Sequence, residues 1–149
     1  MDRHRQNKIK KNARKVLKEY RTLNQIAVNA YNRGGSLDLS YRCWSALAWK
    51  NEILIAVEKI DSIRIKTVLH LRFFSIPKIS SKEICKFLKI SPSLYYRELG
   101  RGLCQFAAFY RYGVLLDDNG LEVLDMQVKQ EYYERQKIAQ DLISDEMYR

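Results

Sequence analysis

The stretch from Ser80 to Tyr110 places the tightest constraint on the fold, because it contains two helix starts in quick succession. Ser80 precedes Glu83 by three residues, a spacing that favours a capping box at a helix N-terminus. Ser91 and Pro92 repeat the signal, since serine caps a helix well and proline fits its first position. Little chain is left for the turn between the two predicted helices. This pattern is typical of a helix-turn-helix unit, whose second helix enters the major groove of DNA.

The second predicted helix has two faces, because its apolar residues recur every three or four positions and should face the core. These residues are Tyr95, Leu99, Gly102 with Leu103, Phe106 and Tyr110. The residues predicted to face the DNA bases are Ser93, Leu94, Tyr96, Arg97 and Arg101. Arginine suits that role because its guanidinium forms two parallel hydrogen bonds to guanine. The alternative is a pair of solvated arginines on an ordinary surface helix.

Neighbouring segments complete a three-helix DNA-binding unit at about residues 61–110. In the first helix of the pair, Ile84, Phe87 and Leu88 should form the apolar face. A further helix from Ser62 to Phe74 is expected to support the pair. The sequence thus predicts an all-α fold with this unit at its centre.

The charge of the chain favours a polyanionic partner over ordinary solvation. The 149 residues carry a formal net charge of +10 and a sequence pI of about 9.6. Residues 1–33 hold ten Lys or Arg against two Asp or Glu, whereas residues 121–149 hold four against seven. The two ends are therefore expected to have different roles, and double-stranded DNA is the expected partner of the basic part.

Residues 1–33 should form one long amphipathic helix with a basic outer face. That face either follows DNA phosphates or keeps a helix soluble that packs on the domain or on a second copy; binding to an anionic membrane surface is a third alternative. The residues predicted to contact phosphate are Ser91, Lys82, Lys86, Lys11 and Lys15.

The rest of the chain divides at two turn-forming segments. Asn32 to Asp38 include consecutive glycines that should end the first helix, and a helical core then covers residues 39–115. Its first helix is expected to bury Trp44, Leu47 and Val57. Residues 119–149 should form a C-terminal amphipathic helix that packs back on the domain, pairs with a second copy or docks on a partner protein.

Enzymatic chemistry finds little support in this sequence. His4 and His70 are the only histidines, no Cys or His pair has metal-ligand spacing, and no glycine-rich phosphate loop follows a strand. We expect no enzyme activity, no cofactor and no metal. Cys43, Cys85 and Cys104 suit reduced thiols. No apolar run is long enough to span a bilayer and no signal-peptide core is seen, which predicts a cytoplasmic protein without a membrane partner.

Several motifs between about residues 15 and 115 resemble the ArpU-type regulators of Gram-positive bacteria, most specifically at 91–107. The matching motifs are Tyr20-Arg21 with Leu23 and Ile26-Ala27, Leu71-Arg72-Phe73, Glu83-Ile84-Cys85, Ser91 with Tyr95-Tyr96-Arg97, and Leu103-Cys104-Gln105-Phe106-Ala107. The same region is similar to the fourth, DNA-reading region of sigma factors. Gly100 and Gly102 depart from the family pattern, so that the reading helix either bends near Gly100 or relies on close backbone approach.

This resemblance implies a transcription regulator of phage late genes or of autolysin (muramidase) production and export. In such a regulator the acidic C-terminal helix would be available for contact with RNA polymerase or with a second copy of the chain. The alternative from a different functional class is a phage assembly or DNA-packaging protein, which would use the helix pair for an architectural contact with DNA.

Overall fold

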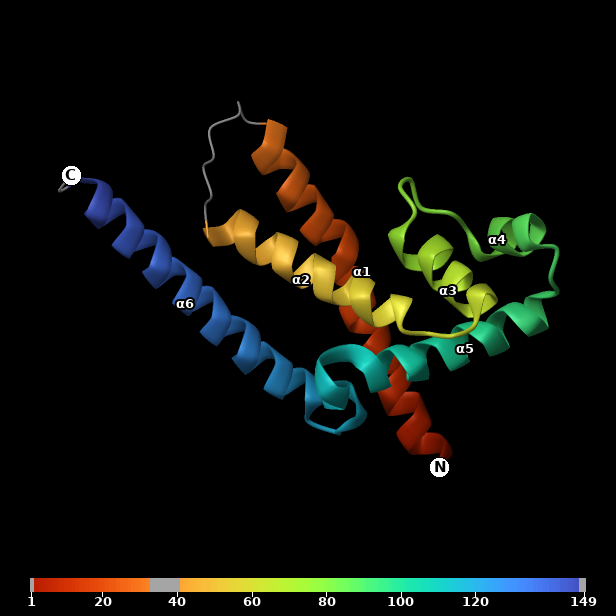
Figure 1. The fold of residues 1–149 in the computed structure, drawn as a ribbon. Coiled ribbons are helices and arrows are strands. Elements are labelled where there is room, and N and C mark those ends of the chain that lie inside the picture. The colour runs from red at the N-terminus through yellow and green to blue at the C-terminus, as the bar shows by residue number, and fades with distance from the viewer. Residues whose placement is uncertain (1, 33–40, 148–149) are drawn as a thin grey trace.

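A computed structural model describes residues 2–32 and 41–147 of the chain, and these residues are almost entirely helical, with no strand among them (Figure 1). This confirms the predicted all-α fold class. The α-helices are α1 (Arg3–Asn32), α2 (Tyr41–Glu58), α3 (Ile63–Leu69), α4 (Ser81–Leu88), α5 (Pro92–Phe109) and α6 (Gly120–Met147). A π-helical turn, η1 (His70–Phe74), continues α3, and a 3-10 segment, η2 (Tyr110–Leu116), joins α5 to α6. The predicted break at Asn32 to Asp38 lies almost wholly outside the described residues.

The long helix α1 is the element against which most of the others pack. It contacts α2, α5 and both short helical segments, and in Figure 1 it passes behind α5. Ile9, Ala13 and Leu17 bury its apolar face, as the helical period predicts. Two polar side chains of α1, those of Asn12 and Arg21, donate hydrogen bonds to backbone carbonyls near the ends of η2 and η1. Asn12 donates to the carbonyl of Leu115 at 3.2 Å.

Arg21 of α1 closes the C-terminal end of η1. Its Nε donates to the carbonyl of Ser75 at 3.0 Å and its Nη2 to the carbonyl of Arg72 at 3.1 Å. A cation there satisfies carbonyls that have no partner within the helix. Burial, and then the neighbouring Arg72, lower the pKa of Arg21. This basic residue therefore has a structural role rather than lying on a solvated outer face.

Helices α4 and α5 both begin with the capping residues expected from the sequence. The Ser80 hydroxyl accepts from the amide of Glu83 at 3.2 Å, and the Ser91 hydroxyl accepts from the amide of Leu94 at 3.1 Å. Lys89 adopts a left-handed conformation with φ 57° and ends α4. Only residues 89–91 separate the two helices.

Two glycines let other helices approach α5 closely. A Cβ on Gly102 would lie 2.9 Å from Cγ2 of Ile65 and 3.1 Å from Cδ2 of Leu69, so α3 crosses α5 where a side chain is missing. A Cβ on Gly100 would lie 3.2 Å from Nζ of Lys10 in α1. Since α5 is helical from Pro92 to Phe109, the glycines serve close approach and do not interrupt the helix.

Two details of the predicted packing are wrong. Phe87 is 73% exposed, because α4 instead turns Ile84 and Cys85 toward the core. Trp44 and Leu47 are 38% and 41% exposed, because α2 buries a neighbouring face. The buried residues of that face are Ala46, Ile53, Ala56 and Val57. The helix expected from Ser62 to Phe74 is present, with Ser62 as its N-cap, and is α-helical at Ile63–Leu69 and π-helical at His70–Phe74.

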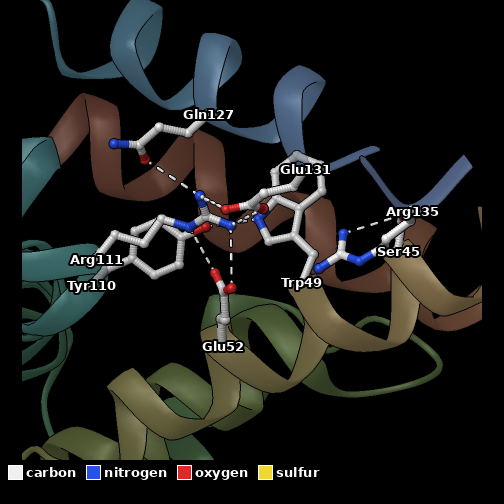
Figure 2. Close-up of polar contacts among 8 residues, drawn as sticks. All are labelled: Ser45, Trp49, Glu52, Tyr110, Arg111, Gln127, Glu131 and Arg135. Carbon is white, nitrogen blue, oxygen red and sulfur yellow. Dashed lines mark hydrogen bonds and ion pairs between the residues drawn. The ribbon is translucent and has the colours of Figure 1, made fainter. Parts of the chain in front are cut away.

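The first part of α6 packs back on the domain, where Arg111 joins three elements (Figure 2). Its Nε donates to Glu52 of α2 at 2.7 Å and its Nη2 to Glu131 of α6 at 2.8 Å. Burial acts to lower the pKa of Arg111, but the hydrogen bonds to Glu131 and Glu52 outweigh it and raise the pKa. Beside it, the indole of Trp49 donates to the hydroxyl of Tyr110 at 2.7 Å.

The chain passes through a left-handed turn between α5 and α6. Arg111, Tyr112 and Gly113 have φ values of 42°, 58° and 79°. Further along α6, Leu124 is buried whereas Ile138 and Leu142 are exposed. The C-terminal helix therefore covers the domain with its first turns and presents apolar residues beyond them.

Gly102→Ala should destabilise the fold by about 1–3 kcal/mol, because the new methyl group meets the branched side chains of Ile65 and Leu69. Gly100→Ala is the matched control. Its methyl group meets only the flexible end of Lys10, so helix propensity should make it stabilising by about 0.5–1 kcal/mol. Urea denaturation of both variants measures the difference. Equal effects at the two positions would contradict the close crossing of α3 and α5.

Arg111→Ala should lower the free energy of unfolding by about 2 kcal/mol and release α6 from α2. The loss is smaller than for a fully buried pair, since Glu52 and Glu131 are 37% and 35% exposed. Compared with the unmodified protein, the variant should show a larger increase in amide hydrogen exchange in α6 than in α1. Lys129→Ala removes an exposed pair with Asp125 on the same helix and should change stability by less than about 0.5 kcal/mol. Unchanged exchange in α6 would show that Arg111 does not anchor this helix.

Candidate nucleic-acid interface

The N-terminal half of α5 presents one polar face to solvent. Tyr95 and Leu99 are fully or almost fully buried, whereas Tyr96 is 59% exposed and Arg97 is exposed beside it. The rotation of α5 is therefore the one that the apolar period predicts. Among the other residues predicted to face bases, Ser93 and Arg101 are exposed and Leu94 is half-buried.

Helix α4 adds two lysines to this face. Lys82 and Lys86 are exposed and lie at an open hollow of about 450 Å³ between α4 and the start of α5. Tyr96 lines the same hollow, together with Pro92. The structure thus brings together one predicted base contact and two predicted phosphate contacts that are separate in the sequence. We call the exposed surface formed by Lys82, Lys86, Tyr96 and Arg97 the α4–α5 face.

The two arginines of α5 differ in their surroundings. Arg97 forms no ion pair with any residue in the described ranges. Arg101 lies 3.9 Å from the carboxylate of Glu98, which is buried between α5 and α3. The same carboxylate lies 3.6 Å from Arg64 of α3. Arg97 is therefore free to bind an external acceptor, whereas Arg101 is partly neutralised from within the protein.

The remaining predicted phosphate contacts fall at other places. The Ser91 hydroxyl is exposed but already accepts the Leu94 amide as the cap of α5. Lys11 lines an open hollow with Asp117 and Asp118 at the end of η2. Lys15 lines a second groove with Leu121 and Asp125 of α6. Both lysines of α1 thus lie near acidic residues, away from the α4–α5 face.

Sequence reasoning missed two cations at this surface. Arg64 lies in the first turn of α3 and reaches Glu98 of α5. Lys10 reaches α5 from α1 at Gly100. Neither position is marked by a motif, because each depends on how helices cross. The one available signal was Gly100 itself, since a glycine inside a helix indicates the close approach of another element.

No other kind of site emerges from the described part of the chain. Residues 2–32 and 41–147 contain no group of three or more His, Cys, Asp or Glu residues that could hold a metal ion. His70 lies 3.3 Å from Glu58 in an exposed surface pair. Within the same ranges, none of the helices combines the length and the apolar character needed to cross a membrane.

Comparison of the chain with models of protein families, with curated proteins and with solved structures finds no match. The family expected from the motifs at residues 91–107 stays a prediction. Functional inference rests instead on the exposed charges, the burial pattern and the arrangement of α3, α4 and α5.

Proposed function

We propose that this chain is a sequence-specific DNA-binding transcription regulator, in which α3, α4 and α5 form a helix-turn-helix unit. The observation that carries the proposal is the α4–α5 face. A short, capped connection joins the two helices, and the second presents Tyr96 beside the lysines of the first. The second also presents exposed Arg97, which has no ion pair to a described residue. A net charge of +10 supports a polyanionic partner.

In the proposed complex the N-terminal half of α5 enters the major groove. The guanidinium of Arg97 can donate two parallel hydrogen bonds to a guanine edge, and Ser93 and Tyr96 lie on the same exposed side. Lys82 and Lys86 then meet phosphates at the edge of the groove and fix the position of α5. Arg101 contributes less to base reading, because Glu98 holds part of its charge.

The regulated genes follow from the resemblance alone. We propose control of phage late genes or of autolysin (muramidase) production and export in a Gram-positive bacterium, without enzymatic activity of the chain itself. RNA polymerase or a second copy of the chain would bind along the far part of α6. Exposed Ile138 and Leu142, four residues apart on one side of the helix, give that part an apolar surface on which such a contact could form.

One observation favours the second candidate function, an architectural DNA contact in phage assembly or packaging. Since Arg101 is paired with Glu98, Arg97 is the one predicted base-facing arginine without an ion pair to a described residue. A face with so few free base-reading groups also suits a protein that holds DNA through its backbone.

Arg97→Ala separates the two functions. Duplexes are first selected from a random pool by the unmodified protein. For a promoter reader, the variant should lose about 1–3 kcal/mol, or about 5- to 150-fold, on the selected duplex and much less on random duplexes. The matched control is Arg42→Ala, which removes an exposed arginine from a different helix, α2. This variant should change neither affinity appreciably.

Two outcomes of this experiment would contradict the promoter reader. If the pool yields no preferred sequence, DNA binding is non-specific and the architectural function takes its place. If Arg97→Ala lowers the affinity equally for all duplexes, Arg97 contacts phosphate only. Measured binding at several salt concentrations distinguishes these cases from a general loss of charge, because each phosphate contact contributes its own share of the salt dependence.

A further inference from the structure

The long helix α1 places an ammonium group against the surface of α5. Nζ of Lys10 lies 3.2 Å, and its Cε 3.4 Å, from the position that a Cβ on Gly100 would occupy. Gly100 has no side chain, and the end of Lys10 uses the room that is left. Two segments that are ninety residues apart in the sequence thereby share one surface.

This surface continues the α4–α5 face. Gly100 follows Tyr96 by four residues and Arg97 by three, and residues at these spacings lie on one side of a helix, one turn apart. The next position along the side that presents Tyr96 and Arg97 therefore lacks a side chain of α5. Lys10 provides a cation at that position from another helix.

Lys10 lacks a counter-ion in the described part of the chain. It is half-buried, and no carboxylate among the described side chains of residues 2–29 and 42–142 lies within ion-pair distance of it. Glu98 is engaged by Arg64 and Arg101 instead. The other titratable group near Lys10 is the thiol of Cys104, whose pKa is raised by burial against the opposing effect of Lys10. A half-buried lysine without an ion-pair partner among the described residues favours an external anion.

We infer that Lys10 is a DNA phosphate contact, delivered by α1 onto the exposed side of α5 next to Tyr96 and Arg97. The inference rests on the proposed DNA binding of α5 and adds α1 to the same interface. It also distinguishes among the lysines of α1. Lys11 and Lys15 lie beside Asp117 and Asp125, whereas Lys10 lies beside the predicted reading helix.

The test measures affinity against salt concentration for Lys10→Gln on a duplex of random sequence and on a duplex selected by the unmodified protein. One lost phosphate contact should make the slope of log K against log salt less steep by about 0.9. The ratio of the affinity of the unmodified protein to that of the variant should then grow about eightfold for each tenfold dilution of salt. The loss should be equal on both duplexes, because phosphate carries no sequence information. Lys10→Arg should restore binding.

Lys18→Gln is the matched control, since Lys18 is an exposed lysine of the same helix. Gly100→Leu is a second variant that keeps the charge of Lys10 but fills the room its side chain uses. It should reduce the slope as Lys10→Gln does, while circular dichroism shows a folded protein. Equal losses for Lys10→Gln and Lys18→Gln, or an unchanged slope for Lys10→Gln, would overturn the inference.

The outcomes separate this inference from the proposed function. If the protein prefers its selected duplex and Lys10→Gln does not change the slope, the promoter reader is supported and the contact by Lys10 is refuted. A protein without sequence preference whose slope falls with Lys10→Gln refutes the promoter reader and keeps the contact. A protein that binds neither duplex refutes both.

Discussion

Burial of the apolar stripe of α1 is the contact on which the other elements depend. Ile9, Ala13, Val16 and Leu17 are almost completely removed from solvent, and α2, α5 and both short helical segments meet along this helix. An isolated amphipathic helix is marginal in water, so most of the stability of α1 comes from this packing. Its polar side chains then complete the arrangement, since Arg21 satisfies the carbonyls at the end of η1. The main role of α1 is thus to stabilise the packing of the other helices, and its charged surface is secondary to that role.

The orientation of the α4–α5 face follows from packing rather than from polar contacts. Gly102 lets Ile65 and Leu69 of α3 approach the backbone of α5, and Tyr95, Leu103 and Phe106 of α5 are completely buried in the core. Because these contacts fix the rotation of α5 about its own axis, the direction of Tyr96 and Arg97 is determined by residues that never reach the surface. A surface held in this way is preorganised, which would lower the entropic cost of the proposed binding to DNA.

Local chemistry made a large part of this structure predictable. The caps at Ser80 and Ser91, the helical class and the buried face of α5 follow from short-range preferences, and the sequence predicted them correctly. The position of the helices relative to one another was not predictable, because it depends on which helices cross. The period of α2 admitted several faces, and Trp44 stays at its edge under the guanidinium of Arg135. In the same way, the charge pattern of α1 marked a basic helix but could not tell which of its lysines lies beside α5.

The left-handed turn at residues 111–113 has a consequence for the charge distribution of the whole molecule. It directs α6 along α2, so that the C-terminal end of this acidic helix lies far from α4 and the start of α5 (Figure 1). Exposed Glu134 and Asp141 lie in the part of α6 toward that end, whereas exposed Lys82, Lys86 and Arg97 lie on α4 and the start of α5. Such a molecule has an electric dipole moment. In the field of a polyanion a dipole experiences a torque, which turns the basic end forward during diffusion and raises the fraction of encounters that are productive.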